Sequence, residues 1–102
     1  MREMMTKGYW LILGTEVTDG EAQAEYGRLW APVAARYGAK VIREAGPELA
    51  EARADTARKL MVEFPDLATA QACFADPDYK AAAVFAHKAA SRDVLIFAAD
   101  FG

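Results

Sequence analysis

The sequence predicts a small α+β domain with an antiparallel sheet. Short apolar runs typical of strands alternate with amphipathic segments, and several of these segments follow an aspartate that can cap a helix. The chain has 102 residues, of which 54% are hydrophobic and 26% are charged. A chain of this size supports one hydrophobic core, so we expect a single domain over residues 1–102.

The first predicted strand covers Tyr9–Val17. Its first residues are aromatic or branched, and residues of both parities are apolar as far as Leu13. A strand that is apolar on both faces is typical of the middle of a sheet.

A helix is predicted from about residue 20, because Asp19 can accept hydrogen bonds from its free N–H groups. We expect Pro32 to kink or break this helix near Trp30 and Ala31, and Gly38 to end it in a left-handed conformation. The apolar positions recur at helical spacing and form one stripe: Ala22, Tyr26, Leu29, Trp30, Val33 and Tyr37.

Two strands should follow. Ala39–Ala45 carries three charges in seven residues, which is typical of an edge strand. The residues from there to Ala54 are expected to form a surface loop or one helical turn. Ala57–Phe64 alternates most regularly, and it places Leu60, Val62 and Phe64 on one face and Lys59, Met61 and Glu63 on the other.

The remaining residues predict two helices and a strand. Asp66 should cap a short helix over Leu67–Phe74, and Asp76 should cap a second that begins at Pro77 and runs to about Ala90. The last strand is expected at Val94–Phe101.

This order of elements predicts a ferredoxin-like βαββαβ domain with the first and third strands in the middle of the sheet. The helices should cover one face only. Depending on strand parity, the open face carries Trp10, Ile12 or Met61, and no further element remains to cover it. An apolar open face on so small a domain predicts a homodimer.

Composition and motifs exclude several function classes. The 12 basic and 15 acidic residues leave no basic excess for nucleic acid. No segment is predicted to span a membrane, and a single cysteine, Cys73, gives no internal disulfide, so we expect a cytoplasmic protein. No glycine-rich phosphate loop or metal-ligand spacing occurs, so no cofactor and no metal are expected.

A set of short motifs, in order along the chain, carries a family resemblance. The motifs are Lys7-Gly8-Tyr9, Val17-Thr18-Asp19, Glu25-Tyr26, Pro32, Tyr37-Gly38, Phe64-Pro65-Asp66-Leu67, Ala70 and Asp76-Pro77-Asp78-Tyr79. They resemble the domain-of-unknown-function family DUF1330 of the dimeric α/β-barrel superfamily. The resemblance implies a ferredoxin-like fold whose sheets pack into a barrel across a dimer axis. It implies no settled activity.

The candidate ligand-binding residues are Tyr9, Tyr26, Trp30, Tyr79 and His87. Aromatic side chains with polar ends suit small organic ligands, although the same residues are also typical of a core. His87 lies at the border of the inward stripe of its helix, where it is either a solvated residue or a titratable contact at the rim of a pocket. Members of the resembled family often carry an arginine there.

Two functions remain open. The first is a homodimeric module that binds a small organic metabolite without catalysis. The second is a cofactor-independent enzyme, monooxygenase-like or isomerase-like, that acts on small aromatic or polyketide-like molecules. The second rests on analogy with related dimeric α/β barrels.

Overall fold

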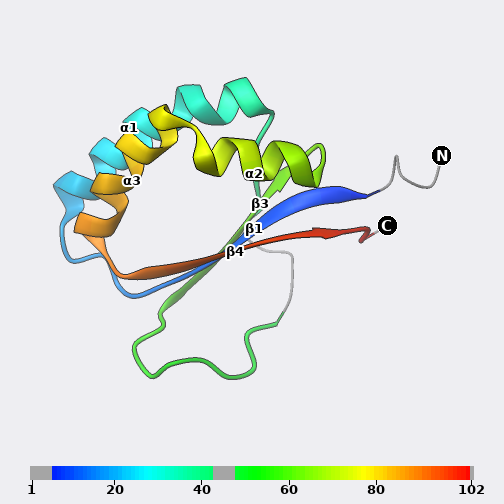
Figure 1. Cartoon of the computed structure of the whole chain (residues 1–102). Coiled ribbons are helices and arrows are strands. Elements are labelled where there is room, and N and C mark those ends of the chain that lie inside the picture. The colour runs from blue at the N-terminus through cyan, green and yellow to red at the C-terminus, as the bar shows by residue number, and fades with distance from the viewer. Residues whose placement is uncertain (1–5, 43–47, 102) are drawn as a thin grey trace.

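The protein forms a four-stranded antiparallel sheet with three helices on one face (Figure 1). The structure is a computed structural model that describes residues 6–42 and 48–101. The elements, in chain order, are β1 (Lys7–Gly14), α1 (Gly20–Tyr37), β2 (Lys40–Ile42), β3 (Arg58–Phe64), α2 (Leu67–Ala75), α3 (Pro77–Ala89) and β4 (Arg92–Ala99). The strands lie in the order β2-β3-β1-β4, so the ferredoxin-like α+β prediction, with β1 and β3 in the middle, is confirmed.

β1 is shorter than predicted and ends at Gly14 rather than Val17. The polar residues that follow it leave the sheet and bond to the connection between α3 and β4. The backbone N–H of Thr15 donates to the carbonyl of Ser91 at 2.9 Å, and that of Thr18 donates to Ala89 at 2.9 Å. These bonds satisfy the backbone without a strand partner.

α1 begins and ends where the sequence predicts. The carboxylate of Asp19 accepts from the N–H of Ala22 at 3.0 Å, and Gly38 takes a left-handed conformation with φ of 65°. Of the predicted kink or break at Pro32, the break does not occur, because α1 continues through this residue to Tyr37. Proline has no N–H, so the carbonyl one helical turn before it has no donor within the helix. Pro32 lies on the exposed side of α1, where water can donate to that carbonyl instead.

The other boundaries differ from the predictions by a few residues. The predicted edge strand beyond Ile42, residues 43–45, lies outside the described residues. Residues 48–57 form a loop with a hydrogen-bonded turn, in which the N–H of Thr56 donates to the carbonyl of Arg53 at 3.0 Å. β4 begins two residues earlier than predicted, because Arg92 and Asp93 pair with Gly14 and Leu13 of β1.

Trp10 lies at the centre of the core between sheet and helices. Its side chain is fully buried, and its indole N–H donates to the carbonyl of Ala70 in α2 at 3.0 Å. Its ring centroid lies 4.9 to 5.6 Å from four other aromatic rings, those of Phe64, Tyr79, Phe74 and Trp30. The even-numbered residues of β1 therefore face the helices, and Met61 belongs to the open face.

The open face of the sheet carries a second aromatic group. The ring of Tyr9 stacks on Phe97 with centroids 5.4 Å apart and contacts Phe101 at 5.0 Å. Leu95 on the same face is 49% exposed, and Phe101 is 64% exposed. The half of the open face formed by β1 and β4 is therefore an apolar surface, which we call the β1–β4 face.

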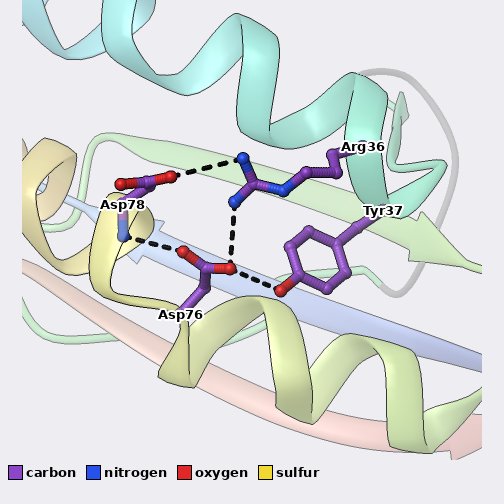
Figure 2. Close-up of polar contacts among 4 residues, drawn as sticks. All are labelled: Arg36, Tyr37, Asp76 and Asp78. Atoms are coloured by element: carbon purple, nitrogen blue, oxygen red, sulfur yellow. Dashed lines mark hydrogen bonds and ion pairs between the residues drawn. The ribbon is translucent and has the colours of Figure 1, made fainter.

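A polar cluster joins the end of α1 to the junction of α2 and α3 (Figure 2). The carboxylate of Asp76 accepts from the hydroxyl of Tyr37 at 2.5 Å and from Arg36 at 2.9 Å, and it caps α3 through the N–H of Asp78 at 2.7 Å. These donors, the hydroxyl of Tyr37 first, lower the pKa of Asp76.

We predict that Phe64→Ala costs about 3–5 kcal/mol of unfolding free energy, because it opens a cavity beside Trp10. Urea denaturation at fixed protein concentration measures the loss. Val84→Ala, on the exposed side of α3, is the control and should change stability by about 0.5 kcal/mol or less. Equal stability of the Phe64→Ala and native proteins would contradict the assigned strand parity.

We predict that Asp76→Asn destabilises the protein at neutral pH. Asparagine also caps helices, so the substitution removes mainly the charge. Because the folded pKa of Asp76 is lowered, its stabilisation is complete above the ordinary value of about 3.9 and is lost as pH falls through the folded value. The stability gap between native and variant proteins should close below that pH in denaturation at pH 7 to 2.5. Asp78→Asn, at a more exposed partner of Arg36, is the control. A gap that does not change with pH would contradict the assignment.

Candidate functional site

A cavity of about 190 Å³ lies between α1 and the helix-facing side of the sheet. All four strands contribute to it, and its mouth is partly open to solvent. The lining residues are Trp10, Ile12, Gly14, Gln23, Tyr26, Gly27, Trp30, Val41, Arg58, Leu60, Val62 and Arg92.

Glycine on both walls leaves the space for this cavity. A Cβ atom built at Gly27 of α1 would meet no atom within 4 Å. On the floor, a Cβ at Gly14 would lie 2.9 Å from a terminal nitrogen of Arg58, so the guanidinium lies where a side chain would otherwise stand. Neither position fills the gap between helix and sheet.

One wall of the cavity is aromatic. The rings of Tyr26 and Trp30 lie nearly parallel, with centroids 6.5 Å apart, and Trp30 contacts Trp10 at 5.6 Å. Tyr79 packs behind them, 5.8 Å from Trp30 and 6.5 Å from Tyr26. Such a wall offers ring faces and edges to a flat organic molecule.

Two arginines also line the cavity. The Nε of Arg58 donates to the carbonyl of Thr15 at 2.8 Å. A terminal nitrogen of Arg92 donates to the hydroxyl of Tyr79 at 3.0 Å, and its guanidinium lies 5.2 Å from the centroid of the Tyr26 ring. The Nε of Arg92 is buried and has no hydrogen-bond partner among the described residues.

The electrostatic balance of the cavity is positive. Among the described residues, its lining contains no aspartate or glutamate, and neither Arg58 nor Arg92 has a carboxylate within 4.0 Å. Burial raises the pKa of Tyr79, so its hydroxyl stays neutral and accepts from Arg92 without cancelling the charge.

The structure brings together three of the five predicted site residues. Tyr26 and Trp30 line the cavity, and Tyr79 packs behind them. Tyr9 lies on the opposite face of the sheet, because it is odd-numbered in β1 and successive side chains alternate. His87 lies on the exposed side of α3 and does not line the cavity. The single cluster expected from the sequence is therefore not formed.

Arg58, Arg92 and Gly14 were not among the site residues predicted from the sequence. A signal for them was present, because Arg58 shares its strand parity with Leu60, Val62 and Phe64, and Arg92 shares its parity with Val94 and Ile96. A cation on the core parity of a strand must find a polar environment or reach solvent. Two such cations at strand ends indicate a polar end to the core.

Other candidate chemistry has little support in the structure. Cys73 is fully buried, and burial raises the pKa of its thiol to about 11, so the thiol is protonated and unreactive at neutral pH. Across residues 6–42 and 48–101, no group of three metal-ligating side chains comes together. In the same described ranges, no helix has the length and apolar character needed to cross a bilayer.

Several solved structures share this fold. A protein of unknown function from Rhodopseudomonas palustris is 24% identical, with a TM-score of 0.63 over 94% of this chain and 82% of its own. The cofactor-independent oxygenase SnoaB from Streptomyces nogalater is 14% identical, with a TM-score of 0.61 over 96% of both chains. A dimeric ferredoxin-like protein of unknown function from Thermobifida fusca is 16% identical, with a TM-score of 0.53 over 91% of this chain and 92% of its own.

No curated protein matches the sequence. The model of the domain-of-unknown-function family DUF1330 matches residues 7–99, which include every helix and strand of the structure. The protein therefore belongs to the DUF1330 family, as the sequence motifs indicated.

Proposed function

We propose that this protein is a homodimer that binds a small organic molecule with one aromatic ring, without catalysis, in the cavity beneath α1. The observation that carries the proposal is the aromatic wall of Tyr26, Trp30 and Trp10 beside open space. An apolar cavity of about 150 Å³ accommodates benzene in a protein interior. A volume of about 190 Å³ therefore suits one ring with a small substituent, and it is too small for a multi-ring polyketide.

The composition of the lining favours binding over proton-transfer catalysis. General acids and bases work best with a pKa near the working pH, and histidine and carboxylates supply most of them. Among the described residues, the ionisable side chains of the lining are Tyr26, Arg58 and Arg92, and arginine stays protonated in proteins. The likeness to SnoaB supports a shared fold only. Among the described lining residues, none favours the alternative that the protein is an enzyme.

The β1–β4 face supports the homodimer. Leu95 and Phe101 expose large apolar side chains there, on the side of the sheet without helices. Burying such a surface against a second copy removes it from water, which is the main driving force of association. The similar protein from Thermobifida fusca is itself described as dimeric.

We predict that light scattering at low micromolar concentration gives twice the chain mass of 11.1 kDa. Leu95→Glu should shift the protein toward the monomer, because it places a charge in the apolar contact. The matched control is Val84→Glu, at an equally apolar and exposed position on α3, and it should stay dimeric. A native protein that is monomeric at this concentration would overturn the proposed dimer.

We predict that single-ring aromatic compounds bind at millimolar or lower concentration. Phenol, benzamide and benzoate form a suitable panel, and the fluorescence of Trp10 and Trp30 reports binding because both line the cavity. Gly27→Leu should abolish binding, because the leucine side chain fills the cavity. The substitution should not destabilise α1, because leucine is more favourable than glycine inside a helix by about 1 kcal/mol.

The control for that substitution is Ala24→Leu, which adds the same side chain on the exposed side of α1 and should bind as the native protein does. Failure of all three compounds to bind the native protein would overturn the proposed ligand site. Equal binding to the Gly27→Leu protein would place the ligand elsewhere.

A further inference from the structure

We propose that the ligand of this cavity is an aromatic carboxylate, whose carboxylate group binds between Arg58 and Arg92 above Gly14. This inference rests on the proposed function and adds the chemical class of the ligand. Three independent observations support it: the strand register, the unused hydrogen-bond donors and the absence of acidic groups from the cavity lining.

The strand register fixes the two arginines as a pair. Gly14 of β1 pairs with Arg58 of β3 on one side and with Arg92 of β4 on the other. Neighbouring strands lie about 4.8 Å apart, so the two arginines emerge from the same side of the sheet about 10 Å from each other. Because Gly14 has no side chain, the guanidinium of Arg58 can lie over it, above the strand that separates the two arginines.

Within residues 6–42 and 48–101, most of the donors on these arginines have no protein partner. Each guanidinium has five N–H groups in a planar fork that matches the two oxygens of a carboxylate. Arg58 uses its Nε for the carbonyl of Thr15, and Arg92 uses one terminal nitrogen for Tyr79. Among the described residues the remaining donors have no partner, and the Nε of Arg92 is also shielded from water.

The charge around the pair favours an anion. The whole chain has a net charge of −3, yet the part of the cavity lining that the structure describes carries two cations and no carboxylate. Partly buried charges are costly unless they are paired, so a bound anion relieves an existing penalty. The aromatic wall lies beside the pair, since the guanidinium of Arg92 rests against the ring of Tyr26.

The size of the cavity selects a carboxylate over a larger anion. After one ring is placed in about 190 Å³, little volume remains for the substituent. A carboxylate is small and planar, whereas a phosphate ester adds a tetrahedral group and a second charge. A phosphate ester is therefore the competing ligand that an experiment must compare.

The first experiment compares benzoate, benzamide and phenyl phosphate as ligands of the native protein by isothermal titration calorimetry. Benzoate and benzamide have nearly the same shape and differ in charge. Charge-assisted hydrogen bonds are worth enough for benzoate to bind about tenfold more tightly or better. Raising the salt concentration should weaken benzoate binding and leave benzamide binding nearly unchanged.

The second experiment repeats these titrations with Arg58→Gln and Arg92→Gln. Each variant should lose about tenfold or more of the benzoate affinity and little of the benzamide affinity. Arg28→Gln, on the exposed side of α1, is the control with the same change in net charge and should bind as the native protein does. Because Arg92 also contacts Tyr79 and Tyr26, Arg58→Gln decides the result if the Arg92→Gln protein does not fold.

The outcomes separate this inference from the proposed function. Equal affinities for benzoate and benzamide would overturn the carboxylate site and leave the aromatic cavity standing. Tighter binding of phenyl phosphate than of benzoate would overturn the carboxylate class. Unchanged benzoate binding by the Arg58→Gln protein would overturn the paired arginines. If no aromatic compound binds the native protein, the proposed function itself fails.

Discussion

The packing of Trp10 between sheet and helices is the contact on which the rest of the structure depends. Its ring contacts aromatic residues from α1, β3 and α3, and the aromatic Phe74 of α2 as well. Its indole N–H bonds the backbone of α2, so the burial of this large side chain leaves no polar atom unpaired. The position of Trp10 also determines which residues of β1 face the helices, and hence which side chains line the cavity.

The fold could be predicted because its elements depend on local pattern. Each of these local signals involves only neighbouring residues. They are the alternation in β3, the helix caps at Asp19, Asp66 and Asp76, and the left-handed end of α1 at Gly38. Pro32 was misjudged because the cost of an interior proline depends on its surroundings. An exposed carbonyl can bond to water, and α1 also packs against α3, so the helix tolerates the loss of one hydrogen bond.

The candidate site could be predicted only in part, because it depends on strand register. Tyr26 and Trp30 share the inward stripe of one helix, so their spacing was sufficient to bring them together. Arg58 and Arg92 are far apart in sequence. They flank the same residue of the sheet only because both pair with Gly14. The alternation of β1 likewise places Tyr9 on the open face, away from the cavity. The sequence of β1 is apolar at both odd and even positions, so it does not show which set faces the helices.

The same alternation gives the two faces of the sheet separate roles. Even-numbered residues of β1 build the floor of the cavity, and the odd-numbered Tyr9 supports the β1–β4 face from below. Tyr9 is only 3% exposed because its ring packs against Phe97 and Phe101, so the apolar surface of that face is formed by Leu95 and Phe101. The proposed ligand site and the proposed dimer surface therefore use side chains of opposite parity in β1 and β4, and the pairing of Gly14 with Arg58 and Arg92 belongs to the first of them.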